Sequence, residues 1–167
     1  EVPFAIGYTT ANIHLAFGEG FEKKPGVSPA RAMQGAYRLL SNLGYSVDFV
    51  DLTEYDLEQL KNYRLIVLPY LFFLDESSAA KLARYVEAGG NLIADAGLAL
   101  RTKEGEIRIQ PPGTLLSEVF GGYEDELAAP IAGVEVITGT DGALIGKSAK
   151  ACGLSQTLIP TSGEVVA

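Results

Sequence analysis

Short apolar segments alternate with amphipathic ones along the first two thirds of the chain, and this alternation restricts the fold more than any other feature. Four segments have the length and apolar character of buried strands: 4–8, 47–52, 65–68 and 92–94. The run Leu65-Ile66-Val67-Leu68 is unbroken, which suits a parallel strand covered on both faces. The pattern predicts an α/β fold, with a doubly wound, mostly parallel sheet and right-handed crossovers.

Capping and stop residues delimit three predicted helices between and after these strands. The expected pairs of N-cap and stop residue are Ser28 and Gly44, Asp75 and Gly89, and Thr114 and Gly121. A short helical turn is expected over 56–63, and the segment 9–26, rich in glycine and charge, is expected to be a long loop.

The last third of the chain has a different pattern. Short strand-like pieces at 134–137, 143–145 and 157–159 are broken by Gly and Thr, which predicts a β-rich, partly antiparallel C-terminal portion. The chain has no internal repeat and no linker that could divide it. We therefore expect a single domain over residues 1–167.

Composition excludes several classes of function. The net charge of -8 argues against general affinity for nucleic acid or an anionic membrane, and no apolar run approaches the ~20 residues of a membrane helix. One Cys and one His allow no internal disulfide and no ordinary zinc site, so we expect no metal. The composition does not determine the cellular compartment, and a cytoplasmic location is favoured for the whole protein.

Four local patterns suggest chemistry, and each has a simpler structural explanation. Gly142–Ser148 resembles a phosphate loop but has Asp141 where the motif needs Gly. Thr9–Asn12 is a poor phosphate loop for a flavin mononucleotide, because the next helix is expected only at Pro29, so no cofactor is predicted. The acidic run 124–126 is typical of a solvated loop, and a lone His14 is more often structural than a catalytic base.

The segment Tyr70-Leu71-Phe72-Phe73 is unusual because it puts large apolar side chains where a strand-to-helix loop is normally polar. These side chains either fold back into the core or fill a contact with another domain or subunit. Both alternatives stay open, and the four residues are the candidate interface.

Three segments resemble the middle domain of the β-galactosidases of glycoside hydrolase family forty-two. They are Val47–Val50, Asn62–Pro69 and Leu82–Ile93, and the later segment Pro111–Gly121 is similar to that domain's next helix. The resemblance covers about residues 4–125. It implies a flavodoxin-like fold of the class I glutamine amidotransferase type, acting as a trimerisation domain that packs against its own TIM-barrel catalytic domain and identical subunits.

The nucleophile of a working amidotransferase is missing. Such enzymes carry a Cys on a tight turn after a sheet strand, whereas Leu92-Ile93-Ala94 is followed by Asp95-Ala96-Gly97. A pair formed by Cys152 and His14 is the remaining alternative for catalysis. We expect no catalytic residues, and the apolar ends of the chain suggest a domain excised from a larger glycoside hydrolase.

A rival hypothesis is a carbohydrate- or small-molecule-binding module, or a degenerate enzyme. Open α/β sheets bind ligands in the crevice at the carboxyl ends of their strands. Thr9, Thr10, Tyr70 and Asp95 would lie near that crevice.

Overall fold

A four-stranded parallel sheet forms the centre of the computed structural model, which describes residues 3–23, 26–102, 104–135, 142–143 and 145–163. Its strands are β1 (Phe4–Tyr8), β2 (Val47–Asp51), β3 (Leu65–Leu68) and β4 (Asn91–Ala94), in the order β2-β1-β3-β4. β1 is an inner strand, with Ala5 opposite both Asp48 of β2 and Ile66 of β3. The predicted parallel sheet is confirmed.

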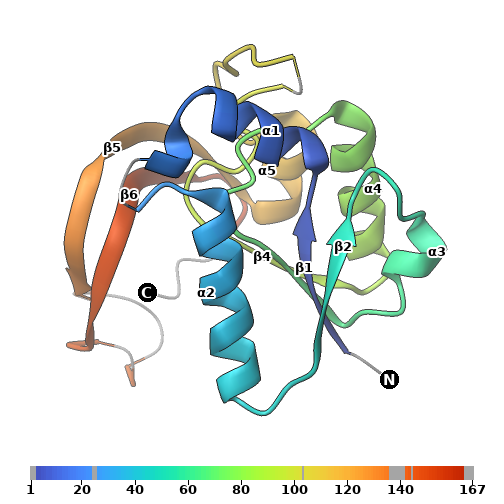
Figure 1. The fold of residues 1–167 in the computed structure, drawn as a ribbon, viewed down its shortest axis with the longest axis horizontal. Coiled ribbons are helices and arrows are strands. Elements are labelled where there is room, and N and C mark those ends of the chain that lie inside the picture. Colours follow the sequence, from blue (N-terminus) through green and yellow to red (C-terminus); the bar gives the residue numbers. More distant parts are fainter. Residues whose placement is uncertain (1–2, 24–25, 103, 136–141, 144, 164–167) are drawn as a thin grey trace.

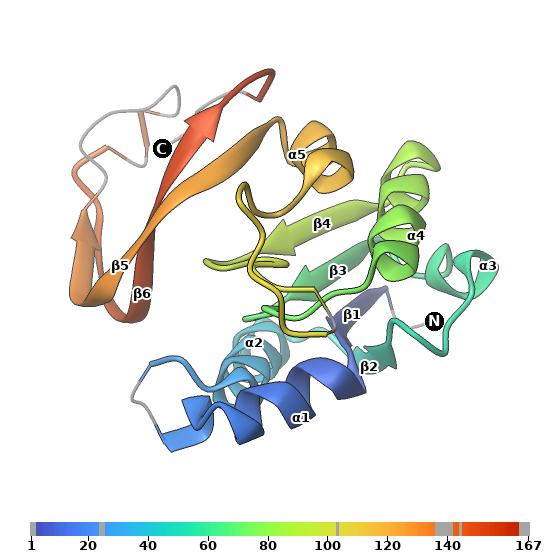
Figure 2. The same ribbon diagram turned by 90° about the horizontal axis from the view of Figure 1, so that it is seen from above.

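Helices cover both faces of this sheet (Figures 1 and 2). The helices α1 (Thr10–Gly18) and α2 (Pro29–Asn42) lie on one side, and α3 (Leu57–Leu60), α4 (Glu76–Glu87) and α5 (Thr114–Phe120) lie on the other. A short 3-10 turn, η1 (Phe21–Lys23), joins the first two. The predicted N-caps of α2 and α4 are confirmed, because Ser28 accepts from the backbone N–H of Arg31 and Asp75 from that of Ser78.

The prediction of a long loop over 9–26 is wrong, because α1 occupies much of it. Thr9 caps this helix by accepting a hydrogen bond from the backbone N–H of Asn12. The buried face of α1 carries Asn12 and Ala16, while Phe17 is 72% exposed. Polar and apolar residues therefore occur on both the buried and the exposed faces, and periodicity alone does not reveal the helix.

The predicted N-cap of α5 is also wrong. Gly113 holds the capping position with no side-chain hydrogen bond, and Thr114 is the first helical residue. Gly121 ends the helix in the left-handed conformation, as predicted.

A long antiparallel hairpin forms the C-terminal portion. Its strands are β5 (Gly122–Glu135) and β6 (Ser148–Pro160), and this β5–β6 arm extends away from the central sheet in Figures 1 and 2. The β-rich, antiparallel prediction is confirmed, but Ala143 and Ile145 lie in turns instead of a strand. Residues 136–137 and 144 of the predicted pieces lie outside the described residues.

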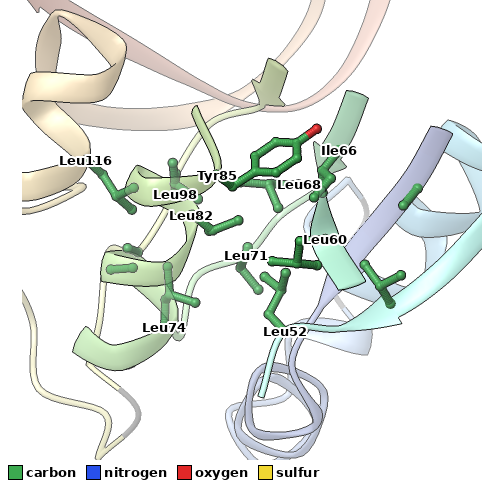
Figure 3. Close-up of a cluster of buried hydrophobic side chains, with 14 residues drawn as sticks. Leu52, Leu60, Ile66, Leu68, Leu71, Leu74, Leu82, Tyr85, Leu98 and Leu116 are labelled. Atoms are coloured by element: carbon green, nitrogen blue, oxygen red, sulfur yellow. The ribbon is translucent and has the colours of Figure 1, made fainter. Parts of the chain in front are cut away.

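The larger core lies between the sheet and the side that carries α3, α4 and α5. Figure 3 shows Leu82 and Tyr85 of α4 and Leu116 of α5 in this cluster, together with Ile66 and Leu68 of β3. Each of these side chains is buried, and packing of this kind fixes the ends of the strands in place. No described helix combines the length and apolar character needed to cross a membrane.

Candidate functional site

The loops that follow β3 and β4 meet at one edge of the sheet, where the strands end. The Oδ1 atom of Asp95, just after β4, accepts a hydrogen bond of 2.6 Å from the backbone N–H of Tyr70, just after β3. Tyr70 has a φ of 43°, in the left-handed region that side chains other than glycine rarely adopt. Asp95 therefore supports a backbone conformation that would otherwise be unfavourable.

Buried side chains from α1 hold the same loop from the other side. The Asn12 amide donates to the carbonyl of Tyr70 and accepts from the N–H of Phe73, both at 3.0 Å, and the Thr9 hydroxyl donates to the Phe73 carbonyl at 3.3 Å. Asn12 was not identified from the sequence, because its role depends on a helix that the pattern does not reveal.

The candidate interface Tyr70, Leu71, Phe72 and Phe73 is buried inside the chain, at 8%, 1%, 1% and 0% exposure. Phe72 packs against Tyr70 and Phe21, with ring centroids 5.3 and 5.5 Å apart. Of the two alternatives, the burial supports folding back into the core. Side chains with so little free surface are poor candidates for a contact with another subunit, and this assignment is corrected accordingly.

Among the residues predicted for a ligand pocket, Asp95 and Tyr70 lie at one, whereas Thr9 and Thr10 do not. Asp95 lines a pocket of about 380 Å³ beneath the β5–β6 arm, and with Tyr70 lines a second of about 470 Å³ beside α2. Thr9 is buried, and the Thr10 hydroxyl donates to Asp51 at the end of β2.

Glu124 of β5 is the main residue of this crevice that sequence reasoning missed. It is 7% exposed, whereas its neighbours Asp125 and Glu126 are exposed, so the prediction of a solvated acidic run is wrong at Glu124. Its Oε2 accepts from the backbone N–H of Gly97 and its Oε1 from that of Leu98, each at 3.1 Å. A burial pattern set by amides 26 and 27 positions earlier leaves no local signal in the sequence.

The environment of the crevice raises the pKa of both carboxyl groups. Desolvation raises the pKa of Glu124 to about 7, against hydrogen bonds from Leu98, Gly97 and Gln156 that lower it. Desolvation also raises the pKa of Asp95, and the nearby charge of Glu124 adds to the effect. The hydrogen bond from the backbone N–H of Tyr70 opposes this rise at Asp95.

The turn after β4 also lacks the geometry of a nucleophile elbow. That geometry places the nucleophile between a strand and a following helix, but α5 begins only at Thr114, after a loop that starts at Asp95. His14 is exposed on α1, and the side chain of Cys152 lies outside the described residues. The described residues hold no group of three potential metal ligands.

The structure tests the arguments against a phosphate loop at Gly142–Ser148 and at Thr9–Asn12. β6 begins at Ser148, so a strand follows Gly142–Ser148 where a phosphate loop has a helix. At Thr9–Asn12 the argument from a late helix is wrong, since α1 begins at Thr10. Thr9 and Asn12 bond to the loop after β3 instead, and the absence of a cofactor stays a prediction.

The parallel order β2-β1-β3-β4, helices on both faces and the crevice at the strand ends define a flavodoxin-like α/β domain with an added β arm. The chain belongs to the β-galactosidase trimerisation domain family, whose model matches residues 14–167. No curated protein matches the chain.

Solved structures support the same fold. β-Galactosidase from Bacillus circulans sp. alkalophilus superposes with a TM-score of 0.79 at 20% identity, over 99% of this chain and 24% of that one. The enzyme from the haloarchaeon Halorubrum lacusprofundi gives 0.78 at 18%, over 98% and 23%. A ThuA-like protein from Bacteroides uniformis gives 0.59 at 18%, over 95% and 61%. The chain thus spans about a quarter of the length of these two β-galactosidases.

Proposed function

We propose that this chain serves as the trimerisation domain of a β-galactosidase-type glycoside hydrolase, acting by packing subunits together and carrying no catalytic residue. The family match over 14–167 carries this proposal. The similar β-galactosidases are about four times longer than the matched region, which leaves room for a barrel of about 250 residues elsewhere in the protein. The absence of a Cys after β4, and a turn there that no helix follows directly, also support a non-catalytic role.

The exposed apolar surface along α2 and β2 is the best candidate for the contact, in place of Tyr70–Phe73. Leu39 of α2 and Leu43, the residue that caps the C-terminus of α2, are each 63% exposed. Tyr37 stacks on Phe49 of the edge strand β2 at 5.8 Å, and both rings are also exposed. Together with Tyr45, these side chains form what we call the α2–β2 surface. Aromatic groups are enriched at subunit interfaces, and the buried centres of such interfaces are more apolar than the rest of a protein surface.

The occupant of this surface in the proposal is a neighbouring subunit of the same protein. A ring of three subunits uses a heterologous contact, in which one surface meets a different surface of the next copy. The α2–β2 surface needs no self-complementarity for that role. It would pair with a separate region of the partner, including regions outside this domain.

Light scattering of the full-length protein tests both parts of the proposal. We expect a mass of three subunits, and we expect Leu39→Glu with Leu43→Glu to reduce it to one. Ile107→Glu, at another exposed apolar residue, is the matched control and is expected to leave the trimer intact. A monomeric wild type contradicts the trimerisation role, whereas a trimer that survives the double substitution contradicts only the choice of surface.

A ligand-binding role is a second candidate, favoured by the pocket of about 380 Å³ in which Asp95, Glu124 and Gln156 lie among apolar side chains. Apolar walls with a few polar groups are typical of small-molecule sites. Thermal stabilisation by a sugar, lost in Asp95→Ala, would support it. The absence of any shift across a broad sugar panel would count against it.

A further inference from the structure

Two consecutive backbone N–H groups in the turn after β4 point at one carboxyl group. Gly97 and Leu98 each donate to a different oxygen of Glu124, and Gly97 also donates to the side-chain oxygen of Gln156 at 2.9 Å. Gly97, Leu98 and Glu124 are all buried. Successive amides of this kind are a recurrent way for proteins to hold an anion, because they offer fixed dipoles without a positive charge.

Residues outside the β5–β6 arm also fix the conformation of this turn. Gly97 has a φ of +82°, and a Cβ atom there would lie 2.5 Å from the ring of Phe72. The N–H of Ala99 is bonded to the carbonyl of Leu71 at 2.7 Å, which anchors the far side of the turn. Contacts with the core thus help to fix the direction of the two amides, in addition to their bonds to Glu124.

Glu124 and Gln156 come from the two strands of the β5–β6 arm, so these contacts join the arm to the sheet. The arm is otherwise joined near its base, where the N–H groups of Thr161 and Gly163 bond to the carbonyl of Gly121, and by the N–H of Glu124, which bonds to Pro111. Among the described residues, the charged group that faces Glu124 is Asp95, a second carboxyl group. The amides offer the attraction that opposes this repulsion.

We infer that the Gly97 and Leu98 amides form a carboxylate-binding site that the chain fills with its own Glu124, and that this contact holds the β5–β6 arm against the sheet. The pocket of about 380 Å³ is lined by Leu98, Glu124 and Gln156, so a small anion that enters it meets three of the residues of this contact. When the Glu124 side chain is removed, the site takes a small free carboxylate such as formate.

Amide hydrogen exchange measured by NMR at pH 8 tests this inference. Leu98 is the reporter, because Glu124 is the one acceptor described above for its backbone N–H. In Glu124→Ala we expect exchange at Leu98 to be about 10 to 100 times faster, the effect of losing a hydrogen bond to a charged group. Sodium formate is expected to slow it again, whereas sodium chloride at the same ionic strength is not. The control Glu126→Ala, at the exposed neighbour on the same strand, is expected to exchange as the wild type does.

Unchanged protection of Leu98 in Glu124→Ala overturns the inference, as does a formate effect no larger than that of chloride. If Glu124→Ala does not fold, Glu124→Gln takes its place. A side-chain amide has one acceptor oxygen where the carboxylate has two, so at least one of the two N–H groups is expected to lose protection. Full protection of both in Glu124→Gln would overturn the inference as well.

Discussion

The raised pKa of Glu124 makes the stability of this domain depend on pH in a direction opposite to that of most carboxyl groups. The pKa rises from an ordinary value of 4.5 to about 7, because burial penalises the charged form more than the amides of Gly97 and Leu98 favour it. The folded chain therefore holds this proton more tightly than the unfolded chain does. The stabilising effect of protonated Glu124 is fully present below pH 4.5 and is lost as the pH rises to about 7.

The size of the effect follows from the shift. One pKa unit corresponds to about 1.4 kcal/mol, so the rise in the pKa of Glu124 from 4.5 to about 7 is a loss of about 3 kcal/mol between pH 4.5 and 7. Glu124 is buried, so solvent screening reduces this figure little. Asp95 titrates in the same direction, and its own raised pKa adds to the wild-type slope.

Urea denaturation of the wild type and of Glu124→Gln between pH 4.5 and 8 measures this contribution. The substitution removes the titrating group, so we expect the variant to lose about 3 kcal/mol less than the wild type over this range. Glu126→Gln, which removes an exposed carboxyl group of the same strand, is the control and is expected to follow the wild type. Parallel curves for wild type and Glu124→Gln would refute the reasoning.

Three further substitutions, one of them with a matched control, test the packing that shapes the crevice and the core. Gly97→Ala is expected to lower the free energy of unfolding by about 3 kcal/mol, because the new Cβ meets Phe72 and the residue keeps a positive φ. The control Gly35→Ala, in open space on α2, is expected to raise the free energy of unfolding by about 0.5 to 1 kcal/mol. Equal effects at the two sites would contradict the contact between residue 97 and Phe72. Ser28→Ala removes the N-cap of α2 and is expected to cost about 1 kcal/mol in a thermal melt; no loss would show that the cap is dispensable. Leu116→Ala leaves a cavity between α5 and the sheet and is expected to cost about 2 to 5 kcal/mol in urea, and a loss below that range would mean that α5 packs loosely.

The parts of the fold that the sequence predicts are those in which local chemistry and tertiary packing agree. Ser28 and Asp75 are good N-caps in any context, and the apolar run of β3 suits a strand covered on both faces, so these elements follow from short segments alone. α1 shows the opposite case. It buries Asn12 and exposes Phe17, because the polar amide is needed to hold the loop after β3.

The sequence predicts the candidate site only at the end of a strand. Asp95 follows directly from the rule that ligands and polar groups gather at the carboxyl ends of parallel strands. Glu124 does not, because the arm brings it to backbone amides of the turn after β4, and its neighbours in the sequence are solvated acids. Tyr70–Phe73 left two alternatives, because aromatic side chains suit both cores and interfaces, and the packing against Phe21 from η1 that favours the core has no sequence signal.

The inner position of β1 has a practical consequence for how this domain is isolated. Similarity to the family begins at residue 14, within α1, whereas β1 ends at Tyr8 and pairs with strands on both sides. A fragment cut at the start of that similarity would leave β2 without a neighbour and give β3 an unpaired edge, which invites aggregation. Boundaries for expression of such domains should therefore be set by the sheet and not by the extent of sequence similarity.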